Sequence, residues 1–214
     1  MFVETLTLGA LAENCYIVGD ETSRAAVIFD PGDEAERILA ALRARNLQLK
    51  LIANTHGDVD HVMAVGTLKQ ITGVPFAIHP ADVPLIKRAH VQYVQWFGTL
   101  VEPVPDPDLE LSDGQELEVD GLKFTVLHTP GHTQGSVCFY FPNAGILIAG
   151  DTLFQGGVGR TDRPVGNWHQ LIESIRDKLL VLPDETVVYP GHGPPTTIGR
   201  EKALNPFLRE LTSG

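Results

Sequence analysis

The stretch NTHGDVDH, residues 54–61, places four side chains that can bind a metal within six residues. They are His56, Asp58, Asp60 and His61. Such a group is costly in a protein core unless its members are paired or bind a cation. We therefore take this stretch as the candidate centre of a functional site.

Further candidate donors lie just past the ends of predicted strands. The strands are residues 49–53, 123–127, 145–149 and 186–189, and the side chains after them are His56, His128 with His132, Asp151 and His192. Each of these donors lies next to or near a glycine, which permits tight turns. Loops at strand ends are where binding sites are usually built, so a shared metal site is indicated.

Each signal is weak when taken alone. A Gly-His pair such as Gly191-His192 is more often a simple turn, and Asp60 sits where the N-cap of a following helix is expected. Five suitable side chains at strand ends nevertheless favour a metal site over coincidence. The remaining histidines have no such setting and are interpreted as structural or surface residues: His79, His90 and His169.

The order of predicted elements indicates an α/β fold. Amphipathic or helix-forming stretches alternate with short strands in the first half, at residues 34–45, 62–71 and 82–97. After a proline-rich connector at 101–108, predicted strands lead to a helix over 168–180 and a last strand. This order predicts two similar halves packed face to face in a single domain, residues 1–214.

Composition limits the function classes. The net charge of −11 argues against a nucleic-acid partner, because phosphate neutralisation needs clustered Lys and Arg. Two cysteines, Cys15 and Cys138, are too few for a secreted disulfide scaffold. No signal peptide is evident and no apolar run is long enough to span a bilayer. We expect a cytoplasmic protein with a small-molecule substrate and no membrane partner. The sequence does not specify the oligomeric state.

Five motifs carry a family resemblance. They are THGDVDH (55–61), HTPGHTQGS (128–136), GDTLF (150–154), GGVGRTD (156–162) and YPGHGPPTTIGREKALNPFL (189–208). Over essentially its whole length, the chain resembles the metallo-β-lactamase-fold hydrolases, and it is most similar to the short, single-domain glyoxalase II-like branch. The resemblance implies a four-layer αββα sandwich, with two mixed β-sheets and helices on the outer faces.

The resemblance also implies two divalent metal ions. One would be held by His56, residue 58 and His132, and the other by Asp60, His61 and His192, with Asp151 bridging the two. In this family a metal-bound hydroxide attacks the substrate, and Asp60 is a candidate to orient it. Three residues are expected to contact and orient the ligands without binding a metal themselves: His128, Arg160 and Asp162.

Asp58 departs from the family pattern HxHxDH, which has a histidine at this position. A carboxylate is shorter than an imidazole and adds a negative charge. We expect the first metal to bind more weakly or through a water, and its bound water to have a higher pKa. Zinc remains the expected metal, but the oxygen donor shifts the preference toward iron or manganese.

The implied reaction is hydrolysis of a thioester or related acyl bond, of the S-lactoylglutathione type. Long glyoxalase II enzymes bind glutathione with a C-terminal helical domain that we do not expect in this protein, so glutathione specificity stays open. Tyr93, Trp96 and Phe97, from the predicted helix 82–97, could form an apolar wall over the site.

Two alternatives stay open. A mononuclear iron oxygenase of the persulfide dioxygenase type would use His56, His132 and Asp151 as a facial triad, which Asp58 would not disturb. A metal-poor protein that binds a ligand without turning it over is motivated by Asp58 alone.

Overall fold

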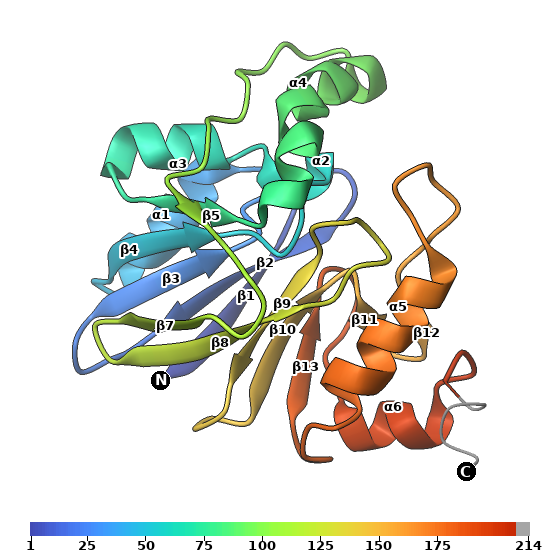
Figure 1. Ribbon diagram of the computed structural model, residues 1–214. Coiled ribbons are helices and arrows are strands. Elements are labelled where there is room, and N and C mark those ends of the chain that lie inside the picture. The colour runs from blue at the N-terminus through green and yellow to red at the C-terminus, as the bar shows by residue number, and fades with distance from the viewer. Residues whose placement is uncertain (209–214) are drawn as a thin grey trace.

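Two six-stranded mixed sheets face each other, with helices on their outer sides (Figure 1). The computed structural model describes residues 1–208. This arrangement confirms the predicted αββα sandwich. The single-domain assignment over residues 1–214 stays a prediction, and its last six residues lie outside the described part of the chain.

The first sheet contains the N-terminal half in simple strand order. Its strands are β1 (Phe2–Leu8), β2 (Glu13–Gly19), β3 (Ala25–Phe29), β4 (Gln48–Ala53), β5 (Phe76–Ile78) and β6 (Leu109–Glu110). The pairs β1–β2 and β2–β3 are antiparallel, and β3 to β6 run parallel. Parallel neighbours need crossovers, and α1 (Ala35–Ala44), α2 (Val59–Val62), α3 (Val65–Thr72), η1 (Pro80–Asp82) and α4 (Val83–Phe97) lie within them.

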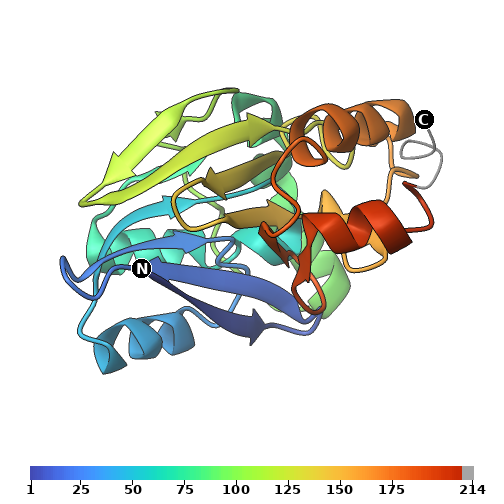
Figure 2. The same cartoon turned by 90° about the horizontal axis from the view of Figure 1, so that it is seen from below.

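The second sheet is built by the C-terminal half in the order β14-β13-β10-β9-β8-β7. Its strands are β7 (Glu116–Val119), β8 (Leu122–His128), β9 (Val137–Phe141), β10 (Ile146–Gly150), β13 (Val187–Pro190) and β14 (Thr196–Thr197). A small hairpin, β11 (Leu153–Phe154) with β12 (Gly157–Val158), follows β10. Three helical segments complete this half: α5 (Trp168–Ser174), η2 (Ile175–Leu179) and α6 (Ile198–Leu204). Figure 2 shows α5 and α6 at the opposite end of the view from α1.

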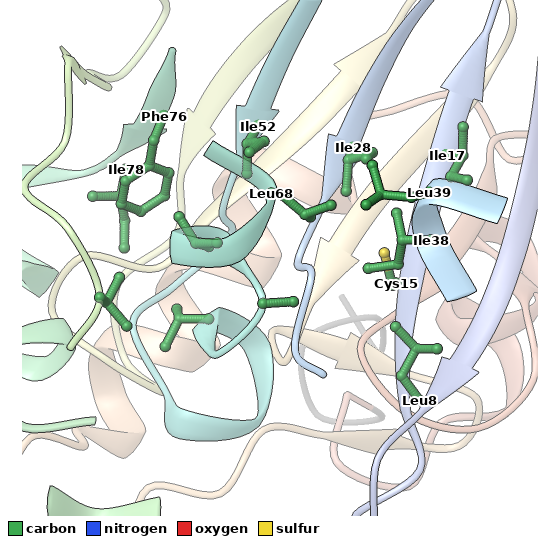
Figure 3. Close-up of a cluster of buried hydrophobic side chains, with 14 of the residues drawn as sticks. Leu8, Cys15, Ile17, Ile28, Ile38, Leu39, Ile52, Leu68, Phe76 and Ile78 are labelled. Carbon is green, nitrogen blue, oxygen red and sulfur yellow. The ribbon is translucent and has the colours of Figure 1, made fainter. Parts of the chain in front are cut away.

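Three apolar clusters hold the layers together. Between the sheets, the Phe29 ring lies 4.7 Å from that of Phe139 and 5.7 Å from that of Phe124, in tilted and edge-to-face contacts. Under the helices of the first sheet, Ile38 and Leu68 pack against residues such as Ile28 (Figure 3). A third cluster fills the space beneath α5, η2 and α6. Because both faces of β2 are covered, all of its residues are buried.

Two helix predictions need correction, and one strand was missed. The helix predicted over 62–71 is two helices, α2 and α3, and Asp60 lies inside α2 instead of capping it; the N-cap residue is Asp58. The helix predicted over 168–180 ends at 174 and continues as a π-helical turn. The first strand, β1, was not predicted from the sequence. Among residues 1–208, no helix is long and apolar enough to cross a membrane.

Candidate metal centre

Seven predicted ligands converge at one edge of the sandwich, where β4, β8, β10 and β13 end. They are His56, Asp58, Asp60, His61, His132, Asp151 and His192. The loop after β4 leads into α2, which lies beside α4 (Figure 1). The two sheets therefore contribute donors to one centre from opposite halves of the chain.

The first donor group consists of His56, Asp58 and His132. The Asp58 Oδ2 atom lies 3.1 Å from His132 Nε2 and 3.5 Å from His56 Nε2. Asp151 approaches the same group, with its Oδ2 atom 3.6 Å from His132 Nε2. Potential ligand atoms of His56, His132 and Asp151 all lie within 4.8 Å of one another.

The second donor group consists of Asp60, His61 and His192. Asp60 Oδ2 lies 3.2 Å from His192 Nε2 and 3.8 Å from His61 Nε2. Asp151 reaches this group as well, since Oδ1 is 3.6 Å from His61 Nε2 and Oδ2 is 3.9 Å from His192 Nε2. The Asp151 carboxylate thus lies between the two groups.

A hydrogen-bond chain orients two of the imidazoles. Asp30, at the end of β3, accepts from Thr55 Oγ1 at 2.6 Å and lies 3.1 Å from His61 Nδ1. Thr55 Oγ1 is in turn 2.9 Å from His56 Nδ1. Because Thr55 gives its proton to Asp30, it accepts from His56, and both histidines carry the proton on Nδ1. Their Nε2 lone pairs therefore face the centre of the site.

Unpartnered buried atoms show that the donors fit a cation. His56 Nε2, His61 Nε2 and Asp151 Oδ1 are buried and have no hydrogen-bond partner. Zinc ligands lie about 2.0–2.2 Å from the ion, so neighbouring ligands in a tetrahedron are about 3.4 Å apart. The measured donor separations of 3.1 to 3.9 Å span this value. Imidazole and carboxylate donors suit zinc, iron or manganese.

The charges of the buried side chains also indicate a site for a cation. Burial raises the pKa of Asp58, but the adjacent His132 and His56 outweigh it and hold that pKa well below the usual range. Burial lowers the pKa of His61, but Asp60 and Asp151 outweigh it and raise that pKa well above the ordinary value. The Asp58 carboxylate is therefore ionised, and the carboxylates around His61 favour a positive charge at that buried position, which a bound cation can supply in place of a proton.

The three residues that were expected to orient the ligands lie in different places. His128 Nε2 is 3.0 Å from the carbonyl oxygen of Gln134, and its ring stacks on His79 at 4.1 Å. Arg160 forms a two-bond ion pair with Asp162, and both side chains are exposed. The contact of this segment with a predicted ligand is through the Arg160 backbone, whose carbonyl accepts from His132 Nδ1 at 2.9 Å.

The close approach of β13 to the site explains one glycine. A Cβ atom on Gly191 would lie 2.1 Å from Asp151 Oδ1 and 2.8 Å from His61 Cε1. No side chain fits there without displacing two predicted ligands. Gly191 is therefore required so that His192 can enter the second donor group.

Two acids that support the site were not singled out from the sequence. Asp30 carries a usable signal, because it too follows a strand end, in the Asp-Pro-Gly turn. Asp82, at the end of η1, gives no such signal. It accepts hydrogen bonds from Gly57 N, Gly135 N and Thr133 Oγ1, at 2.7 to 2.9 Å. Asp82 thereby ties the loop after β4 to the loop after β8.

Arg163 was also missed, although it contacts the first donor group directly. Its Nη1 atom lies 2.7 Å from Asp58 Oδ2, and its Nη2 atom lies 3.0 Å from His132 Nε2. Arg163 follows the GGVGRTD motif by one residue and precedes α5. Nothing in its local sequence indicates this contact.

A cavity of about 400 Å³ opens above the donors. Trp96, Phe154 and Leu11 give it apolar walls, and Arg160 and Arg163 give it positive charge. The predicted aromatic wall from α4 is thus partly present: Trp96 lines this cavity, whereas Tyr93 and Phe97 line a smaller neighbouring pocket beside Asp60. A small molecule that enters the cavity meets both donor groups.

Comparison with known proteins gives the family. The family model for the metallo-beta-lactamase superfamily matches residues 8–192. Hydroxyacylglutathione hydrolase GloC of Haemophilus influenzae is 41% identical, over 97% of this chain and 98% of its own length.

Two solved structures are also similar. The di-iron-bound form of TTHA1623 has a TM-score of 0.87 and 43% identity, covering 96% of this chain and all of its own. The BLEG-1 B3 metallo-beta-lactamase has a TM-score of 0.90 and 35% identity, covering 97% and 100%. The chain belongs to the metallo-beta-lactamase superfamily, a family of metallo-hydrolases that bind divalent metal ions.

Proposed function

We propose that this protein is a metal-dependent hydrolase of the glyoxalase II-like type, which cleaves a thioester such as S-lactoylglutathione. The observation that carries the proposal is the position of the Asp151 carboxylate between two donor groups, each with two imidazoles and one further carboxylate. This arrangement supports a pair of divalent ions. Such a pair activates a water at neutral pH and polarises a carbonyl oxygen.

The chain's own residues have separate roles in this proposal. His56, Asp58 and His132 would hold one ion, Asp60, His61 and His192 would hold the other, and Asp151 lies where it would serve both. The Asp60 carboxylate also orients the attacking water, since it faces the cavity. Asp30 contacts His61 directly and His56 through Thr55, and so keeps the Nε2 lone pairs of both histidines directed inward.

The substrate class rests on a relative and on the cavity. The Haemophilus influenzae relative is named a hydroxyacylglutathione hydrolase, and it aligns over nearly its whole length. The cavity combines the cations of Arg160 and Arg163 with the apolar surface of Trp96 and Phe154. An acyl thioester that also carries a carboxylate suits such a lining.

Zinc is the metal we expect, and iron or manganese is the alternative. Histidine nitrogens favour zinc, whereas the extra oxygen donor of Asp58 shifts the preference toward iron or manganese. The di-iron-bound relative supports the iron alternative.

A mononuclear iron oxygenase of the persulfide dioxygenase type is the second candidate. The observation in its favour is the compact trio of His56, His132 and Asp151, which has the composition of a two-histidine, one-carboxylate triad. The second donor group has no role in that chemistry.

Metal content and two assays separate these functions. The protein is purified without added metal, and its metals are counted by elemental analysis. The hydrolase should hold close to two metals per chain and hydrolyse S-lactoylglutathione. One iron per chain, with oxygen uptake on glutathione persulfide, would instead identify the oxygenase. If no metal binds and no thioester is cleaved after addition of zinc, manganese or iron, only a ligand-binding role remains.

A further inference from the structure

The Arg163 guanidinium lies where a ligand of the first donor group would meet its metal. Its two terminal nitrogens contact Asp58 Oδ2 at 2.7 Å and His132 Nε2 at 3.0 Å. The side chain is only 24% exposed, and its Nε atom is buried without a hydrogen-bond partner. The contact is therefore made inside the site and not on its rim.

The proton on His132 determines what this contact means. His132 Nδ1 is 2.9 Å from the carbonyl oxygen of Arg160, which can only accept, so Nδ1 carries the proton. The Nε2 atom then has one lone pair, which faces both Arg163 Nη2 at 3.0 Å and Asp58 Oδ2 at 3.1 Å, and of these two only Arg163 can donate a hydrogen bond to it. One lone pair cannot serve an arginine and a metal together. Arg163 and a metal ion therefore exclude each other at His132.

Charge explains why an arginine is held there. Asp58 stands where the family pattern has a neutral histidine, so it adds one negative charge to a nearly buried position. Arg163 supplies the matching positive charge through a charge-assisted hydrogen bond. In the second donor group, the ion-pair partners found among residues 1–208 are histidines and carboxylates only. The first group thus contains a positively charged side chain that pairs with it, whereas among residues 1–208 the second group contains none.

We propose that Arg163 competes with the metal for the first donor group, so that the two metal positions fill in a fixed order, the second group before the first. This inference rests on the two-metal site of the proposed function. Binding at the second group requires no residue to leave. Binding at the first group requires Arg163 to give up both Asp58 and His132, which lowers the apparent affinity there.

The test is a titration of metal-free protein with Zn²⁺, in which binding is measured by calorimetry and native mass spectrometry. The wild type should bind two ions in separate steps, the second about tenfold or more weaker than the first. Arg163→Met should strengthen the weaker step by about tenfold, because the competing cation is gone and Asp58 is left unpaired. Arg163→Lys keeps the charge but loses the two-nitrogen fork. The Zn²⁺ affinity of its weaker step should therefore lie between those of the wild type and Arg163→Met.

Two further variants assign the effect. Arg160→Met is the matched control: Arg160 lines the same cavity but pairs with exposed Asp162, and its backbone carbonyl is retained. It should leave both steps unchanged. His192→Ala removes a ligand of the second group, so the titration in that background reports mainly on the first. Arg163→Met should strengthen Zn²⁺ binding there as well.

The outcomes separate this inference from the proposed function. Equal affinities in the wild type and Arg163→Met, with normal far-UV circular dichroism, would overturn the competition. Stepwise binding that depends on Arg163, without thioester hydrolysis, would refute the proposed function and leave the competition standing. Failure of every variant to bind Zn²⁺ would overturn both.

Discussion

The two donor groups share one loop and the Asp151 carboxylate that lies between them, yet their surroundings differ. The loop at residues 54–61 supplies two members to each group, and Asp151 contacts both. His61, in the second group, is fixed from behind by Asp30. The first group contains the extra carboxylate of Asp58 and the guanidinium of Arg163. A change at one motif position is thus matched by a cation from a distant loop, and the two groups become unequal.

The largest effect should come from Asp151→Asn, which removes what the groups have in common. The amide lacks the charge that faces His61, His132 and His192. We expect both metals to bind poorly and kcat/KM for S-lactoylglutathione to fall by about 100-fold or more. Metal analysis and steady-state kinetics measure this. Asp162→Asn, at an exposed ion pair, is the control. Near-normal metal content in Asp151→Asn would show that Asp151 does not bridge.

A smaller effect should follow from Asp58→His, which makes the first group resemble the family pattern. We expect tighter Zn²⁺ binding at the first group, by about tenfold, and a faster hydrolytic rate, because an imidazole reaches further and removes a negative charge. The gain should be larger together with Arg163→Met, since Arg163 would otherwise face a histidine without its carboxylate partner. Residues in contact rarely act additively, so the double variant measures their coupling. If neither the Zn²⁺ affinity nor the hydrolytic rate of this variant rises, the carboxylate of Asp58 serves the function at least as well as an imidazole would.

The smallest effect on the site is expected from Asp82→Asn. Asp82 accepts from Gly57 N, Thr133 Oγ1 and Gly135 N, and an amide offers only one accepting oxygen. We expect a loss of about 2 kcal/mol of stability, seen as a fall in Tm of about 4–8 °C by circular dichroism.

Metal binding should distinguish the groups in this variant as well. The loops that Asp82 joins carry His56 and His132, so binding at the first group should weaken a few-fold while the second is retained. Asp113→Asn, at a more exposed acid, provides the comparison for stability. A variant as stable as the wild type would mean that Asp82 does not hold these loops.

Sequence alone determined the fold class and the candidate ligands. Short strands ending in Gly-flanked His or Asp residues imply side chains gathered at one edge of the sheets, and the structure brings His56, His132, Asp151 and His192 together there. This works because strand and turn preferences are local, and because strand ends in such a sandwich meet on one side. The ligand roles themselves stay predictions.

Only the tertiary structure decided which groups neutralise and orient those ligands. Asp30, Asp82 and Arg163 act across the fold, through contacts with residues far away in the chain. His128 has the same local setting as His132 but stacks on His79 outside the donor groups. Such contacts depend on how loops from both sheets pack against each other. Hydrogen-bond and charge pairing at that range leave no periodic pattern along the sequence.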